Sequence, residues 1–398
     1  MKNKPLASIF LIVFIDLLGF GLILPLLPYY AESFGASDTL VGFLIASYAA
    51  AQLVGAPLLG RLSDRFGRRP ILLLSLFGTL LSFLLLGFAN TLWLLFAARI
   101  ADGITGGNIS VAQAYIADVT DEKSRAKGLG MIGAAFGLGF IFGPATGGFL
   151  SQWGYAVPAF AAAGLVTLNL LMVYLWLPES LTPERRAELA EKEKPKFNLR
   201  ALLDALQRPV SGSLLITRFF FGLAFSIFQT IFSLYALRRF GLEAQQTGYI
   251  LTYVGVLSVI VQGGLVGKLT DRFREDLLIT ASVGIMALSL LGWAFAPSVV
   301  MLLVILAPTA FAGGVLNTVI SSALTKTVQP QEIGGILGLS ASIESLTRVI
   351  APTLGGVLLD QYGSWSPGTF GALILAGLFI YVWNKIFNHP LAQTAPAQ

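Results

Sequence analysis

The sequence predicts an all-α polytopic membrane protein with twelve transmembrane helices in two pseudo-symmetric six-helix bundles. Over 398 residues the composition is 55% hydrophobic and only 12% charged, with a mean hydropathy of +0.77. Soluble domains are about one quarter charged. Apolar runs of roughly the 20 residues that a helix needs to cross a bilayer recur at 6–30, 38–60, 70–89, 91–118, 126–150, 155–177, 211–237, 244–267, 276–296, 298–325, 333–360 and 366–387.

An internal repeat divides the chain into two halves. Three glycine-containing segments recur about 207 residues downstream, the distance from Gly60 to Gly267: 60–69 with 267–274, 106–107 with 313–314, and, within one residue, 147–148 with 355–356. A constant offset indicates two bundles with one plan. We therefore expect an N-terminal bundle over 1–177, a linker over 178–210, a C-terminal bundle over 211–390 and a disordered tail over 391–398.

The segment 60–69 has the sequence GRLSDRFGRR and joins two apolar runs as a short, strongly basic loop. Gly60 and Gly67 suit a sharp turn or a close approach of backbones. Asp64 lies among four arginines, so we expect it to form an ion pair or to contact a helix terminus.

The distribution of basic residues predicts the orientation of the chain. An even number of spans places both termini on one face, and nearly all Lys and Arg residues of the loops fall on that face, whereas the opposite loops carry Arg238 and Arg239. By the positive-inside rule both termini are cytoplasmic. The net charge of +5 then serves orientation and contact with lipid headgroups, and we expect no nucleic-acid partner. The first apolar run is too long for a cleaved signal peptide.

Composition also limits the chemistry. The chain has no cysteine, and its one histidine, His389, lies in the polar tail. Neither disulfides nor a thiolate metal site is therefore expected. No nucleophile–base set is visible, so we predict no enzymatic activity. In the linker, Thr182-Pro183-Glu184 predicts a helix start, and a second helix from Asn198 to Leu206 would either lie on the membrane interface or act as a plain tether.

Several ionisable residues fall inside predicted spans, where each charge costs roughly 2.5–3.5 kcal/mol. These residues must face water or one another. They are Asp16, Arg99, Asp102, Arg218, Glu344 and Arg348. Steps of three, four and seven place Arg99, Asp102, Gly106 and Gln113 on one helical stripe, with Asn108 packing against a neighbour. Glu344 and Arg348, four residues apart, form either a functional pair or a pair that only fixes packing.

Asp16 has no cation on its own helix, so it needs a partner from another helix or it holds a proton. An aspartate that alternates between dry and paired surroundings can bind and release a proton. We predict that Asp16 carries the proton, with Arg99 as charge partner and Asp102 as second carboxylate. Glu344 and Arg348 complete the predicted proton-coupling set, and no cofactor besides the proton is expected.

Glycines and aromatic residues predict how the bundles pack and what they bind. Small residues on the fifth span form a pivot or simply pack tightly, and they are Gly137, Gly143, Pro144 and Gly147. Candidate substrate-binding residues on spans facing a central cavity are Gln52, Gln113, Phe221, Phe225, Gln229, Phe232 and Asn317. The phenylalanines could instead face lipid. An apolar, aromatic pocket suits amphiphilic drugs or lipids.

The segments Gly60–Pro70, Ala98–Gly107 and Gly133–Pro144 resemble the major facilitator superfamily, and nearly the whole chain is similar to its twelve-helix drug:proton antiporters of the tetracycline-efflux-like branch. The resemblance implies a monomeric cell-membrane antiporter that exports amphiphilic small molecules by rocker-switch alternating access. The alternative is a lipid or glycolipid flippase of the same fold. Residues 70–89 lack the acid that tetracycline pumps carry in the third helix, so tetracycline–metal recognition is not predicted.

The resemblance also implies residue roles. It links the fourth-helix arginine, Arg99, to proton coupling. It implies that Asp64 meets a helix end of the other half and that Arg68 meets Asp118 at the end of the fourth helix. Together with Gly60, these residues would form a conformational latch of the outward-open state.

Overall fold

The computed structural model describes residues 4–191, 205–329 and 332–388, and in these ranges the chain is helical with no strand. The predicted all-α membrane fold is confirmed. The chain divides into an N-terminal unit, Met1–Lys194 with Leu242–Tyr253, and a C-terminal unit, Pro195–Gly241 with Val254–Gln398. The bundle and linker boundaries drawn from the sequence stay a prediction. The segment 198–203 and the tail from 391 lie outside the described residues.

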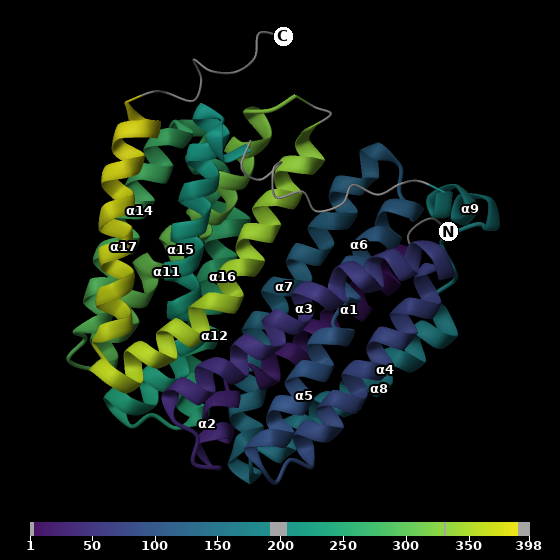
Figure 1. Cartoon of the computed structure of the whole chain (residues 1–398), viewed down its shortest axis with the longest axis horizontal. Coiled ribbons are helices and arrows are strands. Elements are labelled where there is room, and N and C mark those ends of the chain that lie inside the picture. Colours follow the sequence, from purple (N-terminus) through teal and green to yellow (C-terminus); the bar gives the residue numbers. More distant parts are fainter. Residues whose placement is uncertain (1–3, 192–204, 330–331, 389–398) are drawn as a thin grey trace. The chain divides into compact units, whose positions relative to one another are not determined.

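The N-terminal unit consists of helices (Figure 1). They are α1 (Lys4–Ile23), α2 (Leu27–Glu32), α3 (Asp38–Phe66), α4 (Arg68–Gly87), α5 (Leu92–Thr105), α6 (Asn108–Val119), α7 (Glu122–Leu150), η1 (Ser151–Trp153), α8 (Ala156–Trp176) and α9 (Pro183–Glu191). Helix α9 begins where Thr182-Pro183 predicted, and the Thr182 hydroxyl accepts a hydrogen bond from the Arg185 N–H at 3.3 Å.

The remaining helices follow the same plan (Figure 1). They are α11 (Pro209–Phe240), α12 (Ala244–Ile260), η2 (Val261–Leu265), α13 (Val266–Arg272), α14 (Glu275–Ala294), α15 (Val299–Lys326), α16 (Ile333–Tyr362), α17 (Ser366–Val382) and η4 (Trp383–Phe387). The first part of α12, up to Tyr253, belongs to the N-terminal unit. In the described chain ten helical segments are long and apolar enough to cross a membrane.

The first and fourth predicted spans account for the other two crossings, but each consists of two helices. The first is divided into α1 and α2 at residues 24–26, and the fourth is divided into α5 and α6 at Gly106-Gly107. The prediction of one continuous helix over 91–118 is therefore wrong. The break matters for function because polar residues lie on both sides of it.

Helices α1 and α7 pack together through glycines. A Cβ on Gly143 would lie 2.6 Å from the carbonyl carbon of Gly21, and one on Gly147 would lie 2.3 Å from the Leu22 carbonyl oxygen. No larger residue fits at these positions without moving a backbone. Pro144 lies within α7, and its carbonyl oxygen would be 2.3 Å from a Cβ on Gly248, while Gly137 is half-buried. Tight packing is thus present at this predicted pivot, and its role in motion stays a prediction.

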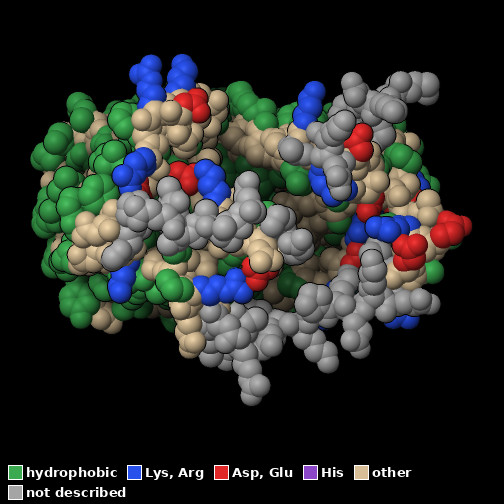
Figure 2. Space-filling view, turned by 90° about the horizontal axis from the view of Figure 1, so that it is seen from above, with side chains coloured by type: hydrophobic (Ala, Val, Ile, Leu, Met, Phe, Trp, Pro, Cys, Tyr) green, Lys and Arg blue, Asp and Glu red, His purple; other side chains and the backbone are tan. Residues whose placement is uncertain are grey.

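The basic segment 60–69 differs from the predicted loop. Helix α3 continues to Phe66 and α4 begins at Arg68, so Gly67 alone makes the turn, with φ of +105°. Gly60 lies inside α3, and a Cβ there would meet no atom within 4 Å, so the prediction that Gly60 shapes a turn is wrong. Figure 2 shows Lys and Arg side chains, with acidic ones beside them, on the face viewed there.

Candidate functional site

The N-terminal unit holds an acid-rich polar cluster on α1, α5 and α6. The Asn108 Nδ2 donates to Asp16 Oδ1 at 2.8 Å. The Arg99 Nη1 lies 2.9 Å from Asp102 Oδ2, and both residues are buried. The Arg99 guanidinium also lies 4.2 Å from the centre of the Tyr48 ring, a cation–π contact. The cluster therefore holds two carboxylates and one guanidinium, and the guanidinium pairs with Asp102.

The helix break at Gly106-Gly107 carries α6, and with it Asn108, toward Asp16. Helix α5 ends at Thr105 and leaves carbonyl groups without helical partners. The Gln52 Nε2 donates to the Gly106 carbonyl at 3.1 Å and to the Tyr48 hydroxyl at 2.8 Å. The Gly107 N–H donates to the Ser75 hydroxyl at 3.3 Å. Side chains from α3 and α4 thus stabilise the break.

The predicted stripe on the fourth span is corrected by this break. Gln113 is exposed, whereas Arg99 and Asp102 are buried, because helical spacing does not continue through Gly106-Gly107. Among the described residues Arg99 forms its ion pair with Asp102. Asp16 accepts a hydrogen bond from Asn108 rather than pairing with Arg99. The sequence analysis left Asn108 outside the site. The Gly-Gly pair just before it was the available signal of a break.

The C-terminal unit holds a second, arginine-rich cluster on α11, α15 and α16. The Arg218 Nη2 lies 2.7 Å from Glu344 Oε2, and the Arg348 Nη2 lies 2.6 Å from Glu344 Oε1. The Arg218 Nη1 donates to Asn317 Oδ1 at 2.7 Å. Glu344 and Arg348 form the predicted pair along one helix, and the structure adds Arg218 and Asn317 to it.

The phenylalanines of α11 are divided between core and surface. Phe232 is fully buried and packs edge-to-face on Phe228, which in turn meets Trp293 of α14 at 5.1 Å between ring centres. The part of α11 that carries Phe228 and Phe232 is therefore protein core. Phe232 contacts no substrate in this structure, and the alternative that it faces lipid is also wrong. Phe221 is buried and stacks on half-buried Phe225.

The other predicted substrate-binding residues have different surroundings. Gln229 and Asn317 are exposed. The Gln52 side chain hydrogen-bonds to the backbone at the helix break, and the Asn317 side chain accepts a hydrogen bond from Arg218. The structure thus brings Asn317 and the predicted charged pair together, but it places Gln52 and Gln113 in different environments.

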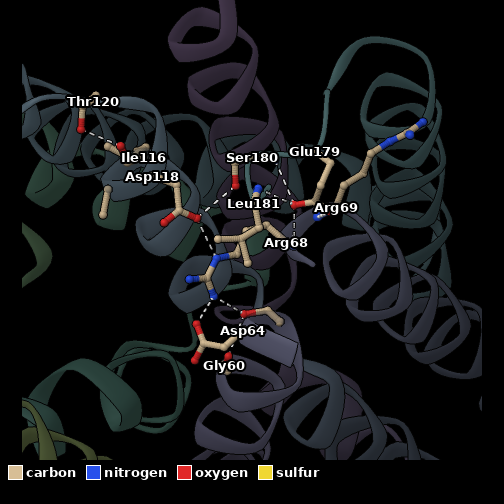
Figure 3. Close-up of polar contacts among 12 residues, drawn as sticks. Gly60, Asp64, Arg68, Arg69, Ile116, Asp118, Thr120, Glu179, Ser180 and Leu181 are labelled. Atoms are coloured by element: carbon tan, nitrogen blue, oxygen red, sulfur yellow. Dashed lines mark hydrogen bonds and ion pairs between the residues drawn. The ribbon is translucent and has the colours of Figure 1, made fainter. Parts of the chain in front are cut away.

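Arg68 is the centre of a network at the turn between α3 and α4 (Figure 3). Its Nε lies 2.9 Å from Asp118 Oδ2, its Nη1 lies 2.5 Å from Asp64 Oδ1, and the same Nη1 donates to the Ser63 hydroxyl at 2.7 Å. The Arg68–Asp118 contact is the one that the sequence resemblance implied. Its role as a latch stays a prediction.

Glu179, which the sequence analysis missed, supports this turn from the segment after α8 (Figure 3). Its Oε1 accepts from the Arg68 N–H at 2.9 Å, and its Oε2 accepts from the Arg69 N–H at 3.2 Å. The N–H groups of Ser180 and Leu181 donate to the same Oε1. A carboxylate here satisfies the first amides of α4 and opposes the positive end of its dipole.

The described residues include no group of three side chains that could hold a metal ion. The polar chemistry of the site is therefore that of carboxylates, guanidinium groups and amides at membrane depth. Such groups are expensive in lipid and mark substrate or proton pathways. The same physics makes each cluster a candidate functional site.

Comparison with known proteins gives a consistent picture. The profile of the Major Facilitator Superfamily matches residues 9–300 and 214–396. The tetracycline resistance protein, class H, of Pasteurella multocida is 33% identical over 95% of this chain and 95% of its own. Solute carrier family 22 member 18 of Mus musculus is 32% identical over 92% of this chain and 91% of its own.

A solved structure shares the fold. It is a bacterial homologue of the human lysosomal transporter Spinster in an inward-facing and occupied conformation, with a TM-score of 0.81 and 15% identity. The match covers 98% of each chain.

Proposed function

Because this chain belongs to the Major Facilitator Superfamily, we propose that it is a proton-coupled antiporter that exports amphiphilic small molecules by rocker-switch alternating access. The observation that carries the proposal is that two carboxylates lie at membrane depth, Asp102 paired with Arg99 and Asp16 hydrogen-bonded to Asn108. The similarity to a tetracycline resistance protein supports export of a drug-like compound. The protein would act in the cell membrane as a monomer with both termini in the cytoplasm.

Asp16 is the proposed proton carrier, and Asn108 supports it in both protonation states. The Asn108 amide donates to the ionised carboxylate at 2.8 Å. The Asn108 Oδ1 is buried, and no group of the described residues donates to it. If the amide turns over, this oxygen can accept the O–H of protonated Asp16. One side chain thus serves the loaded and the unloaded carrier without a change of backbone.

Asp102 is the proposed second carboxylate, and Arg99 is its counter-ion. Arg99 lies between Asp102 and the Tyr48 ring, so the ion pair and the cation–π contact fix the guanidinium. A proton that reaches Asp102 would release Arg99 from its only carboxylate among the described residues. This gives a direct route from proton binding to a change in charge pairing on α5.

At the turn between α3 and α4, we assign Arg68, Asp64 and Asp118 to a latch that exists in one conformational state. Arg68 is buried between the two acids. Separating such a pair leaves charges unpaired, which is costly when they are buried. The latch would therefore hold one state until proton or substrate binding supplies the energy to open it.

The proton gradient supplies enough energy for export. One proton yields about 2.3 kcal/mol per 100 mV and about 1.4 kcal/mol per pH unit. Full-length protein in proteoliposomes tests the proposal: an imposed pH gradient should drive uptake of an amphiphilic dye, and a protonophore should abolish it. Dye movement that ignores both the gradient and the protonophore would overturn proton coupling.

A further inference from the structure

The C-terminal unit carries more positive than negative charge at membrane depth. Two arginines, Arg218 and Arg348, share one carboxylate, Glu344, at 2.7 and 2.6 Å, which leaves a net charge of +1. Asn317, the further polar partner, is neutral. Among the described residues no second carboxylate pairs with either arginine.

An excess charge at this depth needs a physical reason. A membrane helix that places an arginine near its centre costs roughly 2.5–3.5 kcal/mol, and packing alone would be served by a neutral or balanced set. The Arg218 side chain is buried at 8% exposure, whereas that of Arg348 is 59% exposed. An exposed guanidinium at a span centre must face water rather than lipid. The exposed end of the cluster is therefore the Arg348 guanidinium.

The surroundings of Arg348 leave room for a ligand. A guanidinium has five N–H donors, and the described chain occupies one of them on Arg348, through Glu344. The preceding turns of α16 present Gly334, Gly338 and Ala341 on the same face, all exposed, and no atom lies within 4 Å of a Cβ built on either glycine.

Apolar side chains flank the charges in a way that suits an amphiphile. Leu337, three helical turns before Arg348 and about 16 Å from it along α16, shares its face and is exposed. On α11, the aromatic pair Phe221 and Phe225 begins one turn after Arg218 and stacks at 5.6 Å between ring centres. A charged head at the arginines would thus have apolar neighbours on two helices.

We propose that Arg218 and Arg348 bind the anionic group, a carboxylate or sulfonate, of an amphiphilic substrate. Arginine suits this task because its planar fork matches the two oxygens of such a group. Glu344 holds both guanidinium groups in place when the site is empty and competes with the substrate for them. This inference rests on the export function proposed above and names its substrate class.

The test uses two dyes that differ in the charged group. Anilinonaphthalene sulfonate carries the anion, and N-phenylnaphthylamine has nearly the same apolar body without it. Both are measured for binding to the full-length protein in detergent and for pH-driven transport in proteoliposomes of zwitterionic lipid. R348Q should weaken binding of the sulfonate about tenfold or more relative to binding of the neutral dye, and it should lower the sulfonate-to-neutral transport ratio. E344Q should strengthen sulfonate binding.

The opposite signs of R348Q and E344Q separate ligand binding from a structural role, since a merely structural pair would lose function in both variants. R208Q is the matched control, because Arg208 is an exposed arginine of the same unit that pairs with Glu332 at 2.9 Å, and these two residues directly precede α11 and α16. It should leave both dyes unaffected. If R348Q alone fails to fold, R348K and E344Q carry the test, with weaker and stronger sulfonate binding expected.

Three results decide between the hypotheses. Transport of both dyes with no change of the sulfonate-to-neutral ratio in R348Q overturns the anion site and leaves the export function standing. Transport of neither dye under a pH gradient contradicts the export function itself. Displacement of the sulfonate by phosphatidylglycerol, without any transport of the sulfonate, would assign the arginines to a lipid headgroup and overturn the substrate proposal.

Discussion

The two units carry opposite charge patterns inside their helices. In the N-terminal unit Asp102 pairs with Arg99, and the second carboxylate, Asp16, accepts a hydrogen bond from the neutral Asn108. In the C-terminal unit Arg218 and Arg348 share the carboxylate of Glu344. Excess acid suits a cation as small as a proton, and excess guanidinium suits an anion. Two halves built on one plan have thus acquired complementary chemistry.

The two units also differ in backbone conformation at their matching glycine pairs. Gly106-Gly107 and Gly313-Gly314 occupy matching positions of the repeat, yet the first breaks a span and the second lies inside the continuous helix α15. At the break, Gln52 and Ser75 satisfy the freed backbone groups. The sequence repeat therefore conserved residue types, and neighbouring helices decided what they do.

The largest expected effect is on the acid-rich unit. D16N removes the titratable group from the proposed carrier, so pH-driven dye uptake should fall at least a hundredfold, while exchange of dye across the membrane without a gradient persists. Proteoliposome fluorescence measures both. D271N, at an exposed aspartate in the last turn of α13, is the control and should behave as wild type. Undiminished proton-driven uptake in D16N would falsify the carrier role.

Next comes the partner of that carrier. N108L keeps the volume of the side chain but cannot hydrogen-bond to Asp16 in either protonation state, so transport should fall about tenfold. N108Q, which keeps the amide, should recover part of the rate. Initial rates of dye uptake at several pH values measure this. If N108L transports normally at every pH, the proposed role of Asn108 is wrong.

The latch should show non-additive behaviour. R68Q leaves Asp64 and Asp118 without the guanidinium that now joins them, and D118N removes one of its two acids. Each should slow transport about tenfold, and the double variant should lose little more, because both changes break one contact. R185Q, at an exposed pair of α9, serves as control. Fully additive losses would show that the two residues act separately.

The glycine comparison predicts a smaller difference in stability. A Cβ at Gly107 would lie 2.7 Å from the Leu59 Cβ, whereas one at Gly313 would lie 3.0 Å from Phe225 Cε2, the far end of a side chain that can turn. Overpacking costs about 1–3 kcal/mol. G107A should therefore lower the unfolding midpoint by ~5 °C, and G313A by much less, in a thermal scan of the purified protein. Equal shifts would remove the distinction.

The smallest expected effect concerns the cap on α4. E179Q retains one acceptor oxygen but loses the charge that opposes the helix dipole, so we expect a loss of about 1 kcal/mol in stability and a modest slowing of transport. The same thermal scan, with the exposed Glu188 changed to Gln as control, would measure it. A loss of stability no larger than that of the control would show that Glu179 does not stabilise α4.

Composition, apolar periodicity and the repeat were enough to predict the membrane fold, because burying a polar backbone in lipid allows few solutions and helices are the local one. They also singled out the charged residues inside the spans, since a charge inside an apolar run is conspicuous whatever its neighbours. The pair Glu344–Arg348 could be predicted as well, because it depends on spacing along one helix.

Only the tertiary structure decided which charges meet across helices. Asn108 faces Asp16, Arg218 joins Glu344, and Glu179 caps α4, and each contact links residues more than ninety positions apart. Such pairings depend on how helices rotate and where they break, and the sequence states neither. A local sequence pattern determines which side chains a helix presents to its neighbours. Residues far along the chain determine which of those side chains form a site.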